Sequence, residues 1–288
     1  MRGQASWPGI RRNVNLFERS RKETDMNVDE IIAAIDSQDD ALPRRALEAA
    51  MARPGEVTEP LLKLVEETVR HPAKVLGPDN HSMGHLIALY LLAQFRETRA
   101  LPLLVEALSL PGADVVDLFG DALLGDMACI LASVSGGELE AIQGLIESPD
   151  VHPRVRRAAL EALYTLVRCR SVERQAVVDY LGELFAGKLE RRPSEVWTDL
   201  VRTAAWLGPV ELFGEIRKAH GEGLLTGDEV RWVMEDAEES RAWSLERGVP
   251  QIADTGAHDF IRDTLREIGG YGCFSAETRL RPEEVFGC

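Results

Sequence analysis

The 288-residue sequence contains few aromatic residues, few cysteines and no long apolar run. Aromatic residues make up 6% of the chain although hydrophobic residues make up 45%, which favours helices rich in Leu and Ala over a β-sandwich. No apolar run approaches the roughly 18 residues that a membrane-spanning helix needs, and no secretory signal pattern is visible. The sequence therefore predicts a cytoplasmic protein that does not bind a membrane.

The motifs of most enzyme classes are also missing. The four cysteines, Cys129, Cys169, Cys273 and Cys288, form no CxxC pair, which excludes a zinc knuckle or a dithiol redox motif and predicts reduced thiols. The sequence has no GxSxG, phosphate-binding loop or GxGxxG motif. We therefore expect no cofactor and no catalytic residues.

The first 25 residues differ in charge from the rest of the chain. They carry six basic and three acidic residues, a net charge of +3, whereas the whole chain carries −15, which leaves −18 for residues 26–288. They show no helical periodicity. We expect residues 1–25 to be a basic, disordered leader or an upstream extension.

From residue 28 onward, apolar residues recur at helical spacing between Gly, Pro and Asp residues. This pattern predicts an all-α protein without strands. The predicted helical segments are 28–36, 41–52, 58–70, 80–95, 100–109, 115–134, 138–147, 153–168, 172–187, 194–207, 209–219, 227–243 and 258–268.

The predicted helices also come in similar pairs. Residues 88–108, 129–148, 161–185 and 202–219 each contain an apolar helix end, a short break and an amphipathic helix. Aligning Leu92, Leu131, Leu163 and Ala205 gives periods of 39, 32 and 42 residues, which are lengths typical of helical-hairpin repeats. We expect a right-handed α-solenoid over residues 26–243, with residues 244–288 forming a helix and tail that cap its last repeat.

Several stretches carry a family resemblance. DVHPRVRRAALEAL (150–163) and FRETRALPLLVEAL (95–108) look like HEAT-type repeats. Together with ALPRRALEAA (41–50), EVTEPLLKLVE (56–66) and IRDTLREIGGYGCF (261–274), they resemble a bacterial family of HEAT-like proteins of unknown function. The resemblance covers about residues 41–275 and implies the fold but no activity. Many members end in a cysteine-rich SEC-C zinc motif, which the ending RPEEVFGC lacks.

Charge is distributed very unevenly along the predicted repeats. Residues 100–153 contain nine acidic residues and no Lys or Arg. Such a segment repels nucleic-acid phosphate and attracts basic proteins, although an acidic surface that only maintains solubility is an equally good interpretation. The predicted partner-binding acids are Asp114, Asp117, Asp121, Glu138 and Glu140.

These acids suggest a non-catalytic protein–protein interaction scaffold or inhibitor that binds a basic protein or peptide segment, and not nucleic acid. Four of the five tryptophans lie between residues 197 and 243. Most such residues belong to a core, but Trp197, near a predicted helix start, is expected to be exposed and to anchor a partner.

An alternative is a metal-dependent hydrolase. His81 and His85 have the i, i+4 spacing that places two imidazoles on one helix face, and the repeat offset places Asp121 beside them. The Glu of an HExxH motif is missing. Arg156 and Arg157 could bind a phosphate, but pairing with an acid of a neighbouring repeat is expected instead.

The stretch LFGDALLGDM (118–127) interrupts a predicted helix with two Gly-Asp pairs, although neither residue favours a helix interior. On a continuous helix, Asp117 and Asp121 would share a small polar strip that is open to a partner. Asp126 would fall on an apolar flank. There it either needs a buried partner or caps a second helix that begins after a break at Gly125.

Overall fold

The computed structural model describes residues 26–37, 41–77 and 82–269. These residues form helices and no β-strand, apart from an isolated bridge between Ser194 and Leu225. The helices are α2 (Val28–Ile35), α3 (Arg44–Ala52), α4 (Pro54–Arg70), α5 (Pro72–Val75), α6 (Gly84–Phe95), α7 (Ala100–Leu108), α8 (Asp114–Phe119), η1 (Gly120–Leu123), α9 (Met127–Val134), α10 (Glu140–Glu147), α11 (Pro153–Arg168), α12 (Arg174–Glu183), η2 (Leu184–Lys188), α13 (Glu195–Trp206), α14 (Phe213–Gly221), α15 (Val230–Arg247) and α16 (Thr264–Ile268). The predicted all-α class is confirmed.

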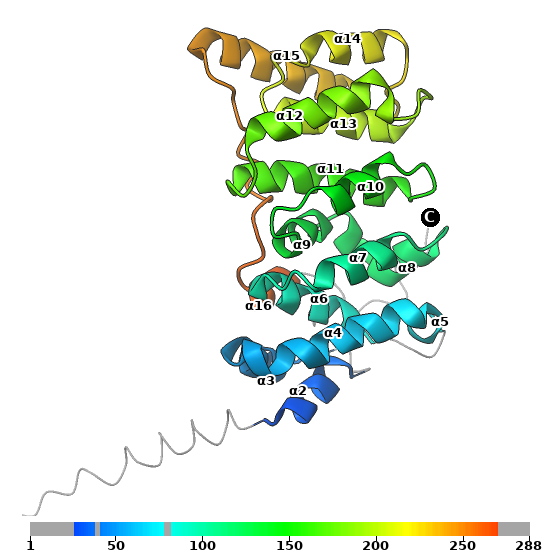
Figure 1. Ribbon diagram of the computed structural model, residues 1–288, viewed down its shortest axis with the longest axis vertical. Helices are drawn as coiled ribbons and strands as arrows, with labels where there is room; N and C mark the ends of the chain where they lie inside the picture. Colours follow the sequence, from blue (N-terminus) through cyan, green and yellow to red (C-terminus); the bar gives the residue numbers. More distant parts are fainter. Residues whose placement is uncertain (1–25, 38–40, 78–81, 270–288) are drawn as a thin grey trace, which may run out of the picture.

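The helices are arranged as an elongated stack (Figure 1). Helices α6, α9, α11, α13 and α15 pack one on the next, and α4 packs on both α6 and α7. On the near side, α7 lies against α10, and α10 packs on α11. Amphipathic helices such as α4 and α10 bury the apolar face that their sequence periodicity defines, whereas α6 and α9 are buried on nearly all sides. The helices α6, α9, α11, α13 and α15 form one layer, and α7 and α10 belong to the other. The side chains between these layers form one continuous core.

The turns between paired helices depend on residues in the left-handed region of backbone conformation. Arg96 ends α6 with φ of 60°, and Arg170 follows α11 with φ of 58°. At the corresponding turn after α9, Gly136 and Gly137 supply φ of 62° and 90°, which glycine adopts without a steric cost. Because these turns are short, the second helix of each pair begins beside the end of the first.

The predicted helix over 115–134 is divided into three parts. Helix α8 ends at Phe119, Gly120 has φ of 50°, η1 forms a 3₁₀ turn, and α9 begins at Met127 with Asp126 at its N-cap position. The hydroxyl of Tyr90 donates a hydrogen bond of 2.6 Å to Oδ2 of Asp126. The prediction of one continuous helix is wrong here, and so is the polar strip that was built on it. Instead, the helix is broken, and Asp126 lies at the start of α9, where its carboxylate accepts the hydrogen bond from Tyr90.

The segment between α15 and α16, residues 248–263, is called the C-terminal strap below. It runs back along one side of the stack, past the ends of α13, α11, α9 and α6 (Figure 1). The amide of Ala253 donates to the carbonyl of Trp206 (2.8 Å), and the amide of Ile261 donates to Oγ of Ser133 (3.0 Å). Just beyond the strap, the amide of Thr264 donates to the side chain of Gln94 (2.8 Å). The strap therefore ties the stack lengthwise. That residues 244–288 cap the last repeat stays a prediction.

Residues 1–25, Cys273 and Cys288 lie outside the described residues, so the predictions made for them stay predictions. Across the described ranges, none of the helices combines the length and apolar character needed to cross a membrane.

Candidate binding site

The five predicted partner-binding acids are all exposed but do not form one surface. Asp114, Asp117 and Asp121 lie on α8 and η1, at the N-terminal end of α9, and α8 packs against α5. Glu138 and Glu140 lie beyond the C-terminal end of α9. The turn that leads to them faces Thr98 and Ser171 in the turns of the neighbouring pairs. The two groups of acids therefore occupy opposite edges of the stack.

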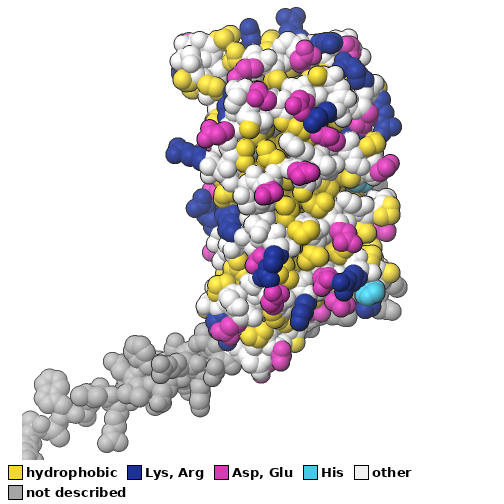
Figure 2. Space-filling model, in the orientation of Figure 1, with side chains coloured by type: hydrophobic (Ala, Val, Ile, Leu, Met, Phe, Trp, Pro, Cys, Tyr) yellow, Lys and Arg dark blue, Asp and Glu magenta, His cyan; other side chains and the backbone are white. Residues whose placement is uncertain are grey.

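The near face of the stack carries no single acidic field. Acidic and basic side chains are interspersed over it, with apolar side chains between them (Figure 2). The uneven charge along the sequence is thus not reproduced as one acidic patch on this face.

Trp197 is fully buried, so the prediction that it is exposed is wrong. Its indole Nε1 donates a hydrogen bond of 3.1 Å to the carbonyl of Glu190, and its ring centroid lies 5.9 Å from that of Phe185. It lies on the inner face of α13, where a large ring fills the space between helices. Among the tryptophans that the structure describes, Trp232 at the start of α15 is exposed instead, with 61% of its surface accessible.

The metal alternative gains no support from the described residues. His85 is buried, and its Nε2 donates a hydrogen bond of 2.7 Å to the carbonyl of Leu118. Burial lowers the pKa of His85, which favours a neutral imidazole with its proton on Nε2. Within the described ranges, no three His, Cys, Asp or Glu side chains are grouped so that they could hold a metal ion. His81 lies outside these ranges, so its pairing with His85 and Asp121 stays a prediction.

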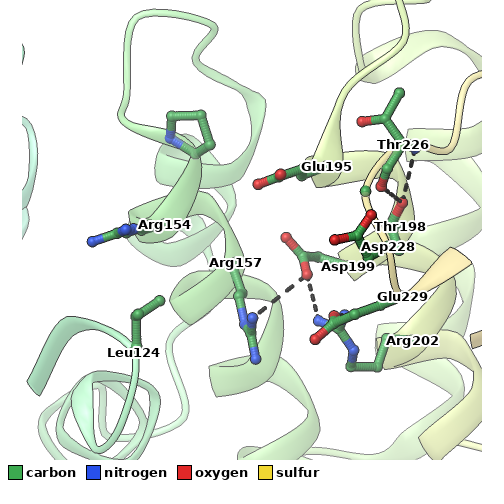
Figure 3. A pocket seen from close by; sticks show the side chains of 12 residues that line it. Leu124, Arg154, Arg157, Glu195, Thr198, Asp199, Arg202, Thr226, Asp228 and Glu229 are labelled. Atoms are coloured by element: carbon green, nitrogen blue, oxygen red, sulfur yellow. Dashed lines mark hydrogen bonds and ion pairs between the residues drawn. The ribbon is translucent and has the colours of Figure 1, made fainter. Parts of the chain in front are cut away.

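A charged cavity of about 360 Å³ lies between the N-terminal ends of α11 and α13 and the loop before α15 (Figure 3). Four acidic and three arginine side chains line it. The lining residues are Leu124, Pro153, Arg154, Arg157, Glu195, Thr198, Asp199, Arg202, Thr226, Gly227, Asp228 and Glu229.

Local sequence features hold the walls of this cavity in place. Pro153 occupies the first position of α11, where its missing N–H is not needed. The ring of His152 accepts a hydrogen bond of 3.2 Å from the amide of Arg154. On the opposite wall, Oγ1 of Thr198 donates to the carbonyl of Thr226 (2.7 Å) and accepts from its amide (3.1 Å). These bonds fix the loop to α13 and so determine where its acids lie.

Two of the arginines are already paired with acids. Nε of Arg157 donates to Glu161 (2.9 Å) and lies 4.0 Å from Asp199. Arg202 donates to both Asp199 and Glu229. These five side chains form an alternating row of charges between α11, α13 and the loop before α15, so their charges largely cancel.

The buried acids of this row have shifted pKa values. Burial raises the pKa of Asp199 to about 6, against the opposing attraction of Arg202 and Arg157. Burial also disfavours ionised Glu161, but hydrogen bonds and charge from His258 and Arg157 outweigh it and lower the pKa of Glu161. Nε2 of His258 lies 3.5 Å from Glu161, so the row connects the cavity to the C-terminal strap.

Three charged side chains of the cavity are left without an ion-pair partner among the described residues: Arg154, Glu195 and Asp228. All three are exposed at the rim. Glu195 and Asp228 come from the wall formed by α13 and the loop, whereas Arg154 lies on the α11 wall (Figure 3). Leu124, 44% exposed, adds an apolar contact beside Arg154.

The expectation that Arg156 and Arg157 pair with acids is confirmed. Arg156 is buried and binds Glu190 with two hydrogen bonds of 2.6 and 2.8 Å, while its Nε donates to the carbonyl of Ile146 (2.8 Å). Both guanidiniums are thus paired with carboxylates. A bidentate pair of this kind fixes the position of α11 relative to the segment before α13.

Sequence reasoning missed most of this site. Glu195, Asp228 and Arg154 belong to three different turns and carry no motif, so nothing in the sequence brings them together. The predicted acid nearest to the site is Asp121, whose carbonyl accepts hydrogen bonds from the amides of Leu124 and Gly125. The available signal was the position of these residues in turns between repeats, where repeat proteins expose side chains on one edge.

Comparisons with known proteins give a family and no activity. The chain is 39% identical over 244 residues to a protein of Chlamydia muridarum. The aligned residues cover 84% of this chain and 96% of that protein. It is 38% identical over 244 residues to a protein of Chlamydia trachomatis, covering 84% and 95%. Both relatives are described as uncharacterized proteins. No solved structure matches the chain significantly.

The family match covers the whole of the described helical stack and extends beyond its last described residue. Residues 26–275 match the family described as "Protein of unknown function (DUF1186)". The match begins where the basic first 25 residues end, and includes both the cavity and the C-terminal strap. The chain therefore belongs to the DUF1186 family of proteins of unknown function.

Proposed function

We propose that the chain is a non-catalytic protein-interaction scaffold, either an adaptor or an inhibitor, that binds a basic side chain of a partner in the cavity between α11 and α13. The proposed architecture is a right-handed α-solenoid of HEAT-like hairpins. The repeat periods and the stacked helical pairs support it (Figure 1), because such pairs bury their apolar faces only against their neighbours.

The observation that carries the proposal is the pair of unpaired carboxylates, Glu195 and Asp228, at the rim of the cavity. The other two acids of the cavity, Asp199 and Glu229, are already bound to Arg202. A Lys or Arg side chain entering from solvent therefore finds two free acceptors. Carboxylates presented by separate elements suit a guanidinium, which donates in several directions.

The apolar side of the cavity suits the rest of such a side chain. Lys and Arg have aliphatic stems that pack on apolar surface while the charged end stays hydrated. Exposed Leu124 and Pro153 lie across the cavity from the two carboxylates. A basic side chain thus has contacts for both its stem and its charged end.

The predicted acids take a different part in this proposal. Asp114, Asp117 and Asp121 lie on the same edge as the cavity, and Asp121 is one turn from Leu124. Exposed charges near a site raise association rates more than affinity. Glu138 and Glu140, on the opposite edge, have no part in binding at the cavity. With a net charge of −15, a nucleic-acid partner is disfavoured.

Selection from a random-peptide library on the immobilised full chain tests the proposal. We expect the selected peptides to contain Lys or Arg. Glu195→Gln with Asp228→Asn should weaken their binding about tenfold, the effect of losing two partly exposed charge pairs. Affinity is measured by fluorescence anisotropy.

The chain offers two matched controls for this experiment. Glu138→Gln with Glu140→Gln removes the same charge on the opposite edge and should leave affinity unchanged. Asp114→Asn, Asp117→Asn and Asp121→Asn together should slow association at low salt and change dissociation little. If the selected peptides lack Lys and Arg, or bind the Glu195→Gln, Asp228→Asn protein as tightly as the wild type, the proposal is wrong.

A further inference from the structure

The cavity has an unpaired cation on the wall opposite its two unpaired carboxylates. Arg154 is exposed in the first turn of α11 and has no ion-pair partner among the described residues. It points away from Asp199 and from the acids of α13 (Figure 3). The free charges of the cavity are therefore separated, with the positive one on α11 and the negative ones on α13 and the following loop.

We infer that the site recognises a partner segment in which an acidic residue lies close to the basic one, with the acidic side chain bound by Arg154. This inference rests on the proposed function and adds the second half of the recognised motif. Opposite charges placed on opposite walls also fix the direction in which the segment lies, because a reversed segment would bring like charges together.

The surroundings of Arg154 strengthen its attraction for an anion. The first turn of α11 contains no acidic residue, although acids are favoured there by the helix dipole. Arg156 and Arg157 of the same turn are paired with acids. The positive end of this 16-residue helix is thus left with Arg154 as its free charge, beside the cavity.

The size of the cavity limits the spacing of the two partner residues. If the cavity of about 360 Å³ is treated as a sphere, it is about 9 Å across, and an extended chain advances about 3.3 Å per residue. The acidic and basic residues are therefore expected two to four positions apart. The three free side chains are all exposed at the rim, which favours a protein segment over a small zwitterion, since small ligands are usually enclosed.

The peptides selected above supply the probes for this inference. We expect an Asp or Glu two to four positions from the required Lys or Arg. Arg154→Glu should weaken their binding about tenfold, and a peptide in which the acid is replaced by Lys should regain binding to that variant. Lys63→Glu, an equal charge change at an exposed residue of α4 far from the cavity, serves as the control.

Each other outcome overturns a defined part of the reasoning. If the peptides keep Lys or Arg but show no preference for an acid, and Arg154→Glu binds them as the wild type does, this inference fails while the proposed function stands. If neither charge is selected, both fail. If free arginine or lysine displaces the peptides at concentrations equal to the peptides' own, the site binds a small zwitterion, and the inference that it recognises a protein segment is wrong.

Discussion

The stability of the stack is predicted to depend on the ionisation of Asp199. This side chain is buried on α13 between Arg157 and Arg202. Burial raises its pKa from the ordinary value of 3.8 to about 6, so the folded chain holds the carboxyl proton more tightly than the unfolded chain. Asp199→Asn removes this titration and keeps the size of the side chain.

The sign and size of the effect follow from the two pKa values. The pKa of Asp199 is higher in the folded chain than in the unfolded chain. The stabilisation that the protonated carboxyl gives is therefore complete below the unfolded pKa and is lost as pH rises through about 6. A difference of about two pKa units corresponds to about 3 kcal/mol of unfolding free energy. Relative to Asp199→Asn, the wild type should therefore lose about 3 kcal/mol, most of it between about pH 4 and pH 7.

Urea unfolding followed by tryptophan fluorescence measures this difference. Four of the five tryptophans lie between residues 197 and 243, so they report on the part of the stack that contains Asp199. The method uses dilute protein. This limits aggregation, which low net charge promotes near the isoelectric point of about 4.9. Other titrating groups are common to both proteins and cancel in the comparison.

If the unfolding free energy of the wild type minus that of Asp199→Asn stays constant across this pH range, or rises with pH, the prediction is wrong. A rise would mean that Arg157 and Arg202 stabilise ionised Asp199 by more than its burial costs. The charge row would then be a net source of stability at neutral pH.

Three further predictions concern buried groups and metal binding. Trp197→Ala should destabilise the fold by about 3–5 kcal/mol because it opens a cavity, whereas Trp232→Ala should change stability by about 0.5 kcal/mol or less; equal urea midpoints would contradict this. Glu190→Ala should cost about 3–5 kcal/mol, since it leaves buried Arg156 without its carboxylate; calorimetry that shows an unchanged melting temperature would count against it. Purified protein should contain no stoichiometric metal and keep its melting temperature with a chelator, and one bound Zn, Mn or Fe per chain would instead support a site at His81 and His85.

The sequence pattern located most of the helices but did not reveal the site. Apolar periodicity located α11 as 153–168 to the residue, because Pro153 begins it and its buried face recurs at helical spacing. The same periodicity failed over 115–134. There Gly120 turns the chain with a positive φ that a continuous apolar pattern does not reveal. Trp197 shows a similar limit, since its position near a helix start says nothing about which face is covered.

The acids show why a charge pattern along a chain is a poor guide to a surface. Asp121 and Glu138 are 17 positions apart in sequence, but α9 lies between them and places them on opposite edges. Conversely, Arg154, Glu195 and Asp228 are distant in sequence and line one cavity because each lies where one helical pair passes to the next. Their proximity depends on how the pairs stack, which is decided by packing along the whole chain.

The C-terminal strap has a consequence for how the molecule folds. In a stack of helical pairs most contacts join neighbours in sequence, so its parts can unfold one after another. The strap adds a contact between residues 128 positions apart, Ile261 with Ser133, and Thr264 just beyond it adds one between residues 170 positions apart, with Gln94. Contacts between residues so far apart in sequence raise the contact order of the chain. Because they form only after the intervening helices are in place, they slow folding. They also couple pairs that do not touch, so that the strap converts a row of locally stable units into a body that unfolds cooperatively.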